Sequence, residues 1–203
     1  MNKKSYVGIF GGTFDPIHNG HLKLAKTAKT ELNLDNVIFM PAYIPPHKQN
    51  KNVTPGEHRL MMTKLATSDM DYFDVSDLEM RLEGASYTAR TLTTLKESYD
   101  RLVFIVGADS FIALEKWYHP EIIFEKAEIA CAYRDGINEN MLSDKAEEYA
   151  LRFNAVCHVL HMDGLDVSST LIREKLRKNI KPDGLIPDSV YEYIKENGLY
   201  HEV

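Results

Sequence analysis

Two histidines, His18 and His21, stand three residues apart where a strand pattern gives way to a helix pattern. The apolar run 7–12 before them ends in glycines, which predicts a buried strand. After them, apolar residues recur at helical spacing over 22–32. The start of a helix presents N–H groups and a positive dipole end. We therefore expect a phosphate site there, with either imidazole donating a hydrogen bond to a phosphoryl oxygen.

Four residues between that strand and that helix are expected to form part of the same site, namely Gly11, Gly12, Thr13 and Phe14. The two glycines have no Cβ, so a bulky ligand can approach their main chain. One alternative is an ordinary strand–helix turn with two solvated histidines. Another is a metal centre, but two histidines are too few ligands and no nearby carboxylate–cysteine cluster completes a tetrahedral set. We therefore expect no protein-bound metal.

A second group of polar residues opens a helix near the other end of the chain, in the stretch 167–173. Ser168 and Ser169 supply hydroxyls, and Arg173 follows about one turn later on the same side as Ser169. Hydroxyls, main-chain amides and a guanidinium together make a polyphosphate clamp. The alternative is a serine-capped surface helix with an exposed arginine. Two separate phosphate sites suit a reaction between two phosphorylated substrates.

Four further residues are candidates for contacts with the rest of a nucleotide. Gly107 and Asp109 follow an apolar strand pattern, where Asp109 could accept hydrogen bonds from a ribose, hold hydrated Mg²⁺, or cap a helix beginning near Ser110. Thr88 precedes a helix pattern and is a candidate N-cap. Trp117 is the only tryptophan, and its ring either packs in the protein or attracts a cationic ring.

These stretches resemble the nucleotidyltransferase superfamily that carries the motif (H/T)-x-G-H, here 18–21. The longer string G-G-T-F-D-P-I-H-N-G-H, over 11–21, is similar to that of the bacterial nicotinate-mononucleotide adenylyltransferases. The stretch 167–173 matches the family's I-S-S-T-x-I-R with Val167 in place of Ile. The resemblance runs almost from end to end of the chain.

The resemblance implies transfer of AMP from ATP to nicotinate mononucleotide, giving nicotinate adenine dinucleotide and pyrophosphate in NAD biosynthesis. Mg²⁺ would accompany ATP, and a homo-oligomer is possible because family members often form one. The implied catalytic residues are His18, His21 and Arg173. The implied ATP-binding residues are Gly11, Gly12, Thr13, Phe14, Gly107, Asp109, Ser168, Ser169 and Arg173. The implied residues for nicotinate mononucleotide are Lys48, Thr88, Trp117, Tyr118 and Arg134.

Two of these acceptor residues depend on the resemblance more than on their own surroundings. Lys48 lies in a proline-bounded polar loop, where composition alone favours a solvated side chain, but the family has a P-P-H-(K/R) element there, which also includes His47. Arg134 matches the arginine of a family R-P-G pattern, but this chain continues with Asp135 and Gly136. The shape of that loop is therefore expected to differ.

Strand and helix patterns alternate along the chain, which predicts an α/β, Rossmann-like, doubly wound parallel sheet in a single domain, 1–203. After the first strand, further strands are expected at 36–42, 73–80, 102–106, 128–133 and 156–162. Helices are expected at 54–68, where Thr54 would begin a capping box with Pro55 as the first helical residue, and at 89–98, 120–126, 140–152, from 168, and 187–197.

Composition limits the class of protein. The net charge of −6 over 203 residues argues against non-specific nucleic-acid binding. No long uncharged apolar run predicts a membrane span, and the first residues have no signal-peptide core. Cys131 and Cys157 lie in separate apolar segments and are expected to be thiols, as in the cytoplasm.

Two other functions remain open at this point. A sister adenylyltransferase would use nicotinamide mononucleotide or phosphopantetheine as acceptor, but such enzymes often have T-x-G-H and lack the combination of P-P-H-K and tryptophan. A non-catalytic nucleotide sensor would not need His18, His21 and Arg173 intact.

Overall fold

A six-stranded, fully parallel sheet forms the centre of the computed structural model, which describes residues 5–45, 53–133, 139–162, 164 and 167–200. The strand order is β3-β2-β1-β4-β5-β6, the order of the doubly wound nucleotide-binding folds. The sheet therefore confirms the predicted fold class. The strands are β1 (Tyr6–Gly12), β2 (Asn36–Pro41), β3 (Phe73–Val75), β4 (Arg101–Gly107), β5 (Glu128–Tyr133) and β6 (Cys157–His161).

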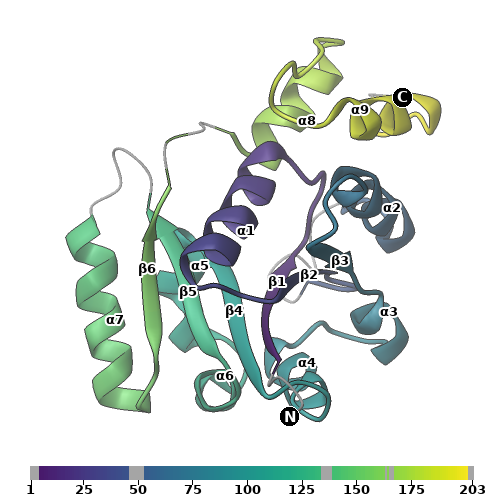
Figure 1. The fold of residues 1–203 in the computed structure, drawn as a ribbon. Helices are drawn as coiled ribbons and strands as arrows, with labels where there is room; N and C mark the ends of the chain where they lie inside the picture. The colour runs from purple at the N-terminus through teal and green to yellow at the C-terminus, as the bar shows by residue number, and fades with distance from the viewer. Residues whose placement is uncertain (1–4, 46–52, 134–138, 163, 165–166, 201–203) are drawn as a thin grey trace.

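Helices cover both faces of this sheet (Figure 1). They are α1 (Asn19–Glu31), α2 (Gly56–Thr67), α3 (Leu78–Leu82), α4 (Thr88–Leu95), α5 (Ala108–Ala113), the 3₁₀ helix η2 (Leu114–Lys116), α6 (Pro120–Lys126), α7 (Glu139–Phe153), α8 (Ser169–Arg177) and α9 (Asp188–Glu196). Apart from α3, the α-helices lie within a few residues of patterns that the sequence shows.

The core is split into two layers because side chains alternate between the faces of each strand. In β4, Val103 and Ile105 join a cluster that includes side chains from α1, α2, α8 and α9. Phe104 and Val106 point the other way, into a cluster built with α3 to α7. A strand buried on both faces needs a continuous apolar run, which is why the run at β4 was visible in the sequence.

Two local predictions are wrong. The third strand ends at Val75 instead of continuing to residue 80, and Leu78–Leu82 forms α3. The predicted strand included the first three residues of that helix, because a segment this short suits either conformation. The capping box at Thr54 is also absent: Pro55 is the N-cap of α2, and no side chain caps that helix. The Thr54 carbonyl instead accepts a hydrogen bond from Arg59.

The C-terminal helices α8 and α9 lie beyond the carboxyl end of the sheet, next to the start of α1 (Figure 1). The main-chain N–H of Asn19 donates to the carbonyl of Leu185 at 2.9 Å, and its side chain donates to Gly184. His58 in α2 and Tyr193 in α9 are joined by a 2.8 Å hydrogen bond. The two ends of the chain therefore meet at the edge where ligands bind in such sheets. None of the described helices is both long and apolar enough to cross a lipid bilayer.

Candidate active site

A cavity of about 420 Å³ opens where β1 and β4 end, at the carboxyl edge of the sheet. It brings together most of the predicted site residues from five separate parts of the chain. The predicted residues that line it are Gly11, Gly12, Thr13, Phe14, His21, Thr88, Gly107, Trp117, Tyr118 and Ser169.

The two histidines cap the first helix reciprocally. His18 is the N-cap of α1, and its Nδ1 accepts a hydrogen bond from the main-chain N–H of His21 at 3.3 Å. In return, Nδ1 of His21 accepts from the N–H of His18 at 3.2 Å, and the two rings stack 3.5 Å apart. A neutral imidazole with Nδ1 as acceptor carries its proton on Nε2. The caps therefore select the tautomers whose Nε2–H is the ring donor.

The two histidines are not equally placed. His21 lines the cavity, whereas His18 is buried and lies against His21 instead of on the cavity wall. His21 also packs edge-on against Phe14, with ring centroids 5.0 Å apart. The geometry thus places His21 where a ligand in the cavity can reach it, and His18 where it holds the His21 ring in position.

Glycine is required at positions 12 and 20 by close packing. A Cβ on Gly12 would lie 2.7 Å from the Phe14 ring, and one on Gly20 would lie 2.7 Å from Val167. Real Cβ atoms do not approach so closely, so a larger residue would push the loop or α8 away. The sequence predicts that Gly12 leaves space for a ligand. The structure adds another reason for a glycine there, since the Phe14 ring occupies the space that a Cβ would need.

The second motif lies directly against the first. The Ser169 hydroxyl donates to the carbonyl of Pro16 at 2.9 Å, and the Arg173 guanidinium donates to the carbonyl of Asp15 at 2.6 Å. Residues more than 150 positions apart in the chain thus form one structure around the 15–16 main chain. Arg173 lies beside the cavity without lining it, and Ser168 is exposed, where its hydroxyl caps α8 by accepting from the N–H of Leu171.

Aromatic residues and a helix start form the other end of the cavity. Trp117 is half-buried and packs edge-on against Phe104. Tyr118 is exposed and lies on Tyr87, with ring centroids 4.3 Å apart. Thr88 begins α4, whose first N–H groups have no acceptor within the helix. This end can therefore hold a flat ring and an anionic substituent together.

The positions of five other predicted residues need correction or lie beyond what is described. Thr88 is the first residue of α4 instead of its N-cap, which is Tyr87. Asp109 does not cap a helix either: α5 begins at Ala108 with Gly107 as N-cap, and Asp109 is exposed in its first turn, outside the cavity lining. Lys48, His47 and Arg134 fall outside the described residues.

Buried charged residues that the sequence reasoning missed support the site from behind. Arg59 and Asp15 are both buried, and Asp15 accepts a 2.6 Å hydrogen bond from the Tyr200 hydroxyl. Glu79 is buried and lines the cavity; burial raises the pKa of its carboxyl, and hydrogen bonds from Ser86 and Thr91 oppose the rise. Arg59 shares a helical face with apolar residues of α2, and a charge on such a stripe was the available signal.

Comparisons with known proteins agree with this geometry. The family model described as cytidylyltransferase-like matches residues 9–175. The chain is 42% identical over 196 residues to the nicotinate-nucleotide adenylyltransferase of Bacillus subtilis (strain 168), covering 96% of this chain and 97% of that relative. The chain belongs to the nicotinate-nucleotide adenylyltransferase family.

Solved structures of the same type share the fold of this adenylyltransferase. The nicotinic acid mononucleotide adenylyltransferase of Plasmodium falciparum complexed with NaAD superimposes with a TM-score of 0.75 at 21% identity, covering 97% of each chain. The same enzyme complexed with APC gives a TM-score of 0.75 at 20% identity and the same coverage. At this level of identity, the likeness concerns the fold.

Proposed function

We propose that this adenylyltransferase moves the AMP moiety of ATP onto nicotinate mononucleotide, releasing pyrophosphate and forming nicotinate adenine dinucleotide for NAD biosynthesis. One observation carries the proposal. A single cavity joins the starts of α1 and α8, at His21 and Ser169, to an aromatic end that contains Trp117 and the start of α4 at Thr88. Its two ends suit a triphosphate and a pyridine mononucleotide that must meet.

The reaction needs positioning more than acid–base chemistry. The phosphate oxygen of the mononucleotide is already anionic, so no proton has to be removed before it attacks the α-phosphorus of ATP. The new O–P bond forms as the bond from the α-phosphorus to the bridging oxygen of pyrophosphate breaks, and pyrophosphate leaves with that electron pair. Catalysis of such a step depends on in-line placement and on stabilising the charge that spreads over the phosphoryl oxygens.

The proposed roles follow from where each donor lies. Nε2–H of His21 donates to a phosphoryl oxygen on which charge develops, and His18 fixes the ring that does so. Ser169 and Arg173 stand at the triphosphate end, where they also fix the main chain of 15–16. Gly107 adds open space at the end of β4, since a Cβ there would meet no atom within 4 Å.

Mg²⁺ is proposed to enter with ATP as part of the substrate. Among the described residues, no group of three or more histidine, cysteine, aspartate or glutamate side chains is arranged to hold a metal ion. Mg²⁺ is commonly held by substrate phosphates and water with few protein ligands, which suits a metal that the triphosphate brings. When bound, it would neutralise charge on the leaving pyrophosphate.

The acceptor end favours an acid over an amide. A carboxylate only accepts hydrogen bonds, and the N–H groups at the start of α4 only donate. An amide would present its own NH₂ to one of these donors, and site-built mismatches of this kind discriminate by up to roughly 10⁴-fold. The ring of Trp117 would attract either acceptor equally, because stacking does not distinguish the substituents.

A pyrophosphate-release assay with ATP and three acceptors tests the proposal. We expect turnover with nicotinate mononucleotide, a much lower kcat/KM with nicotinamide mononucleotide, and none with phosphopantetheine. Trp117→Ala should weaken both pyridine acceptors while leaving most of the acid-to-amide ratio. Equal kcat/KM for acid and amide would refute the assigned preference, and no release with any acceptor would refute the enzymatic role.

A further inference from the structure

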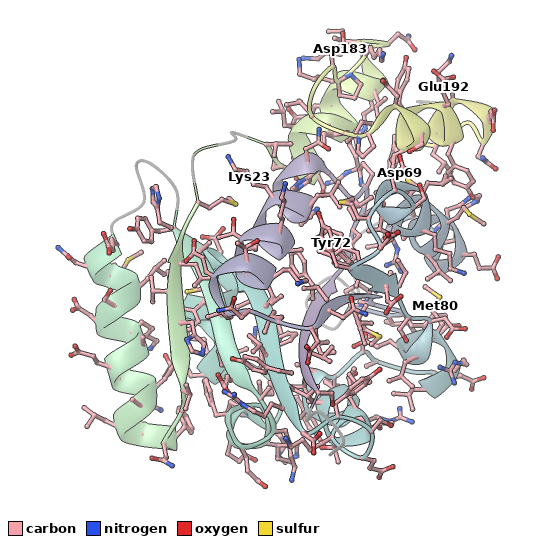
Figure 2. All side chains as sticks on the ribbon, in the orientation of Figure 1. Lys23, Asp69, Tyr72, Met80, Asp183 and Glu192 are labelled. Atoms are coloured by element: carbon pink, nitrogen blue, oxygen red, sulfur yellow. The ribbon has the colours of Figure 1, made fainter. Side chains whose placement is uncertain are left out.

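Glu79 is a buried carboxylate on the wall of the acceptor end of the cavity, and nothing in the proposed reaction uses it. It lies in α3 with 7% of its surface exposed. Figure 2 labels its neighbour Met80, at the edge of the molecule formed by α2 and α3. A carboxylate removed from water is costly unless donors surround it, so its partners indicate what it is there to hold.

Two hydroxyls donate to Glu79. Thr91, in α4, donates to its Oε1 at 2.8 Å, and Ser86 makes a side-chain hydrogen bond with it. The Ser86 oxygen also accepts from the main-chain N–H of Tyr43 at 2.8 Å, so its single proton is directed to Glu79. A chain of hydrogen bonds therefore connects the segment after β2, the segment before α4 and α4 itself.

The same segment after β2 is held from its other side by Arg59. The guanidinium donates to the carbonyls of Tyr43 at 3.1 Å, Thr13 at 2.8 Å and Thr54 at 2.7 Å. Tyr43 is thus fixed at its N–H through Ser86 and at its carbonyl through Arg59. The charges of Arg59 and Glu79 attract each other, which lowers the cost of burying both.

This arrangement places Ser86 and Thr88 relative to the cavity. The N–H of Ser86 donates to the carbonyl of Ile44 at 3.0 Å, and Ile44 pairs with Ala85 in a parallel bridge. Ser86, Tyr87 and Thr88 all line the cavity beside Glu79. The segment that would receive the pyridine substituent is therefore tied to α4 and to the segment after β2 by Glu79 and its partners.

We propose that Glu79 is a positioning residue for the acceptor: by accepting from Ser86 and Thr91, it holds 86–88 in the arrangement that binds the pyridine end of nicotinate mononucleotide. The inference rests on the proposed function for the identity of that acceptor. Glu79 does not touch the reacting phosphates, so it acts on acceptor binding and leaves ATP binding alone. A carboxylate accepts from both hydroxyls as they stand, whereas a glutamine presents one NH₂, so one of the two hydroxyls would have to turn its proton away and accept instead.

The fluorescence of Trp117 gives a direct readout of acceptor binding. It is the only tryptophan of the chain and lines the same end of the cavity. Nicotinate mononucleotide is titrated into wild type, Glu79→Gln and Thr91→Val without ATP, and KM values for both substrates are measured separately. We expect the Kd for the mononucleotide to rise about tenfold in Glu79→Gln and less in Thr91→Val, the scale of a lost hydrogen bond to a charged group. The KM for ATP should stay within about twofold, since no ATP contact changes.

Thr67→Val is the matched control. The Thr67 hydroxyl is buried and bonded to the Thr63 carbonyl in α2, so its loss destabilises the protein without touching the Glu79 partners. It should lower Tm and leave both substrate affinities unchanged. If Glu79→Gln does not fold, Thr91→Val carries the test alone.

The outcomes separate the two ideas. An unchanged Kd for nicotinate mononucleotide in both variants, with wild-type turnover intact, overturns the role of Glu79 and leaves the proposed function standing. If the variants bind ATP and nicotinate mononucleotide equally more weakly, the role of Glu79 is also overturned, because that pattern indicates general damage to the protein. A wild-type protein that neither binds nor adenylates nicotinate mononucleotide overturns the proposed function and the inference with it.

Discussion

His21 at the start of α1 can do two things at once, because an imidazole has two distinct nitrogens. Nδ1 of each ring satisfies an N–H of the other residue at the helix start, where the first N–H groups need acceptors from outside the helix. Nε2 is then the protonated nitrogen. An aspartate could cap this helix equally well, but a carboxylate has no proton to donate to the phosphate that we propose for this site.

This dual role predicts how substitutions at His21 will divide stability from catalysis. His21→Ala should lower kcat by roughly two orders of magnitude, the scale of one lost transition-state donor, and should also destabilise α1. His21→Gln should lower kcat similarly but keep more stability, because a glutamine at this position of a capping box can still reach the N-cap N–H. Steady-state kinetics and urea unfolding of both variants measure the two effects.

His158→Ala is the control for those variants. His158 lies near the start of β6, where its Nε2 contacts Glu128 at 2.8 Å, at the edge of the sheet away from the cavity. The kcat of the His158→Ala variant should remain that of the wild type. A His21→Ala protein with near-normal kcat would remove His21 from the catalytic role.

At the scale of elements, the site depends on helix starts that meet at one edge of the sheet. The start of α8 combines a cap and a proposed phosphate contact, and Ser168 allows these to be separated. Ser168→Ala should lower the free energy of unfolding by about 1 kcal/mol, because the N–H of Leu171 loses its acceptor. Ser168→Asp should restore the cap, since aspartate is an equally good N-cap.

The variants Ser168→Ala and Ser168→Asp are expected to differ in their KM for ATP. Aspartate places a negative charge beside the proposed triphosphate site, so Ser168→Asp should raise the KM for ATP even though the helix is well capped. Thermal unfolding and ATP saturation curves of the two variants check both parts. If Ser168→Asp bound ATP as tightly as the wild type, Ser168 would be a cap alone.

At the scale of the whole molecule, the last described residue completes the first motif. Tyr200 donates to Asp15 at 2.6 Å across a sequence separation of 185 residues, and burial, reinforced by the Asp15 carboxylate, raises the pKa of this phenol. Tyr200→Phe should lower the free energy of unfolding by about 1–3 kcal/mol, because a buried carboxylate loses a donor. Denaturant unfolding measures this, with Tyr191→Phe as control; an equal loss in both would mean that the contact with Asp15 contributes nothing.

Folding also protects both cysteines. Neither forms a disulfide: burial raises the pKa of the Cys131 thiol to about 12 and that of Cys157 to about 11. At pH 8 the thiolate of Cys157 would then be roughly one part in a thousand, against a substantial fraction at the unperturbed pKa of about 8.5. A thiol-labelling reagent at pH 8 should therefore react slowly with the native protein and rapidly in denaturant. Rapid labelling of the native protein would contradict the buried position of Cys131 and the partly buried position of Cys157.

Much of this protein was determined by local patterns in its sequence. The apolar runs at β1, β4 and β5 are strands because a strand buried on both faces cannot tolerate polar residues. The string around His18 and His21 predicted a strand, a turn and a helix start, and the structure has all three. Glycine at position 12 and serine at position 168 were likewise recognisable from local requirements, even though the packing of Phe14 against Gly12 was not.

Only the tertiary structure decided how distant groups combine. Residues 78–82 form a helix although β3 was expected to continue to residue 80, because a segment this short suits both conformations and packing chooses between them. Arg173 and Ser169 bind main-chain carbonyls beside Pro16, and Glu79 binds Ser86 and Thr91; no sequence spacing specifies such contacts. Buried polar groups need hydrogen-bonding partners, but the sequence shows only that the polar residues are present, not which of them pair. Which groups meet is determined by the order in which the strands pair and the helices cover them.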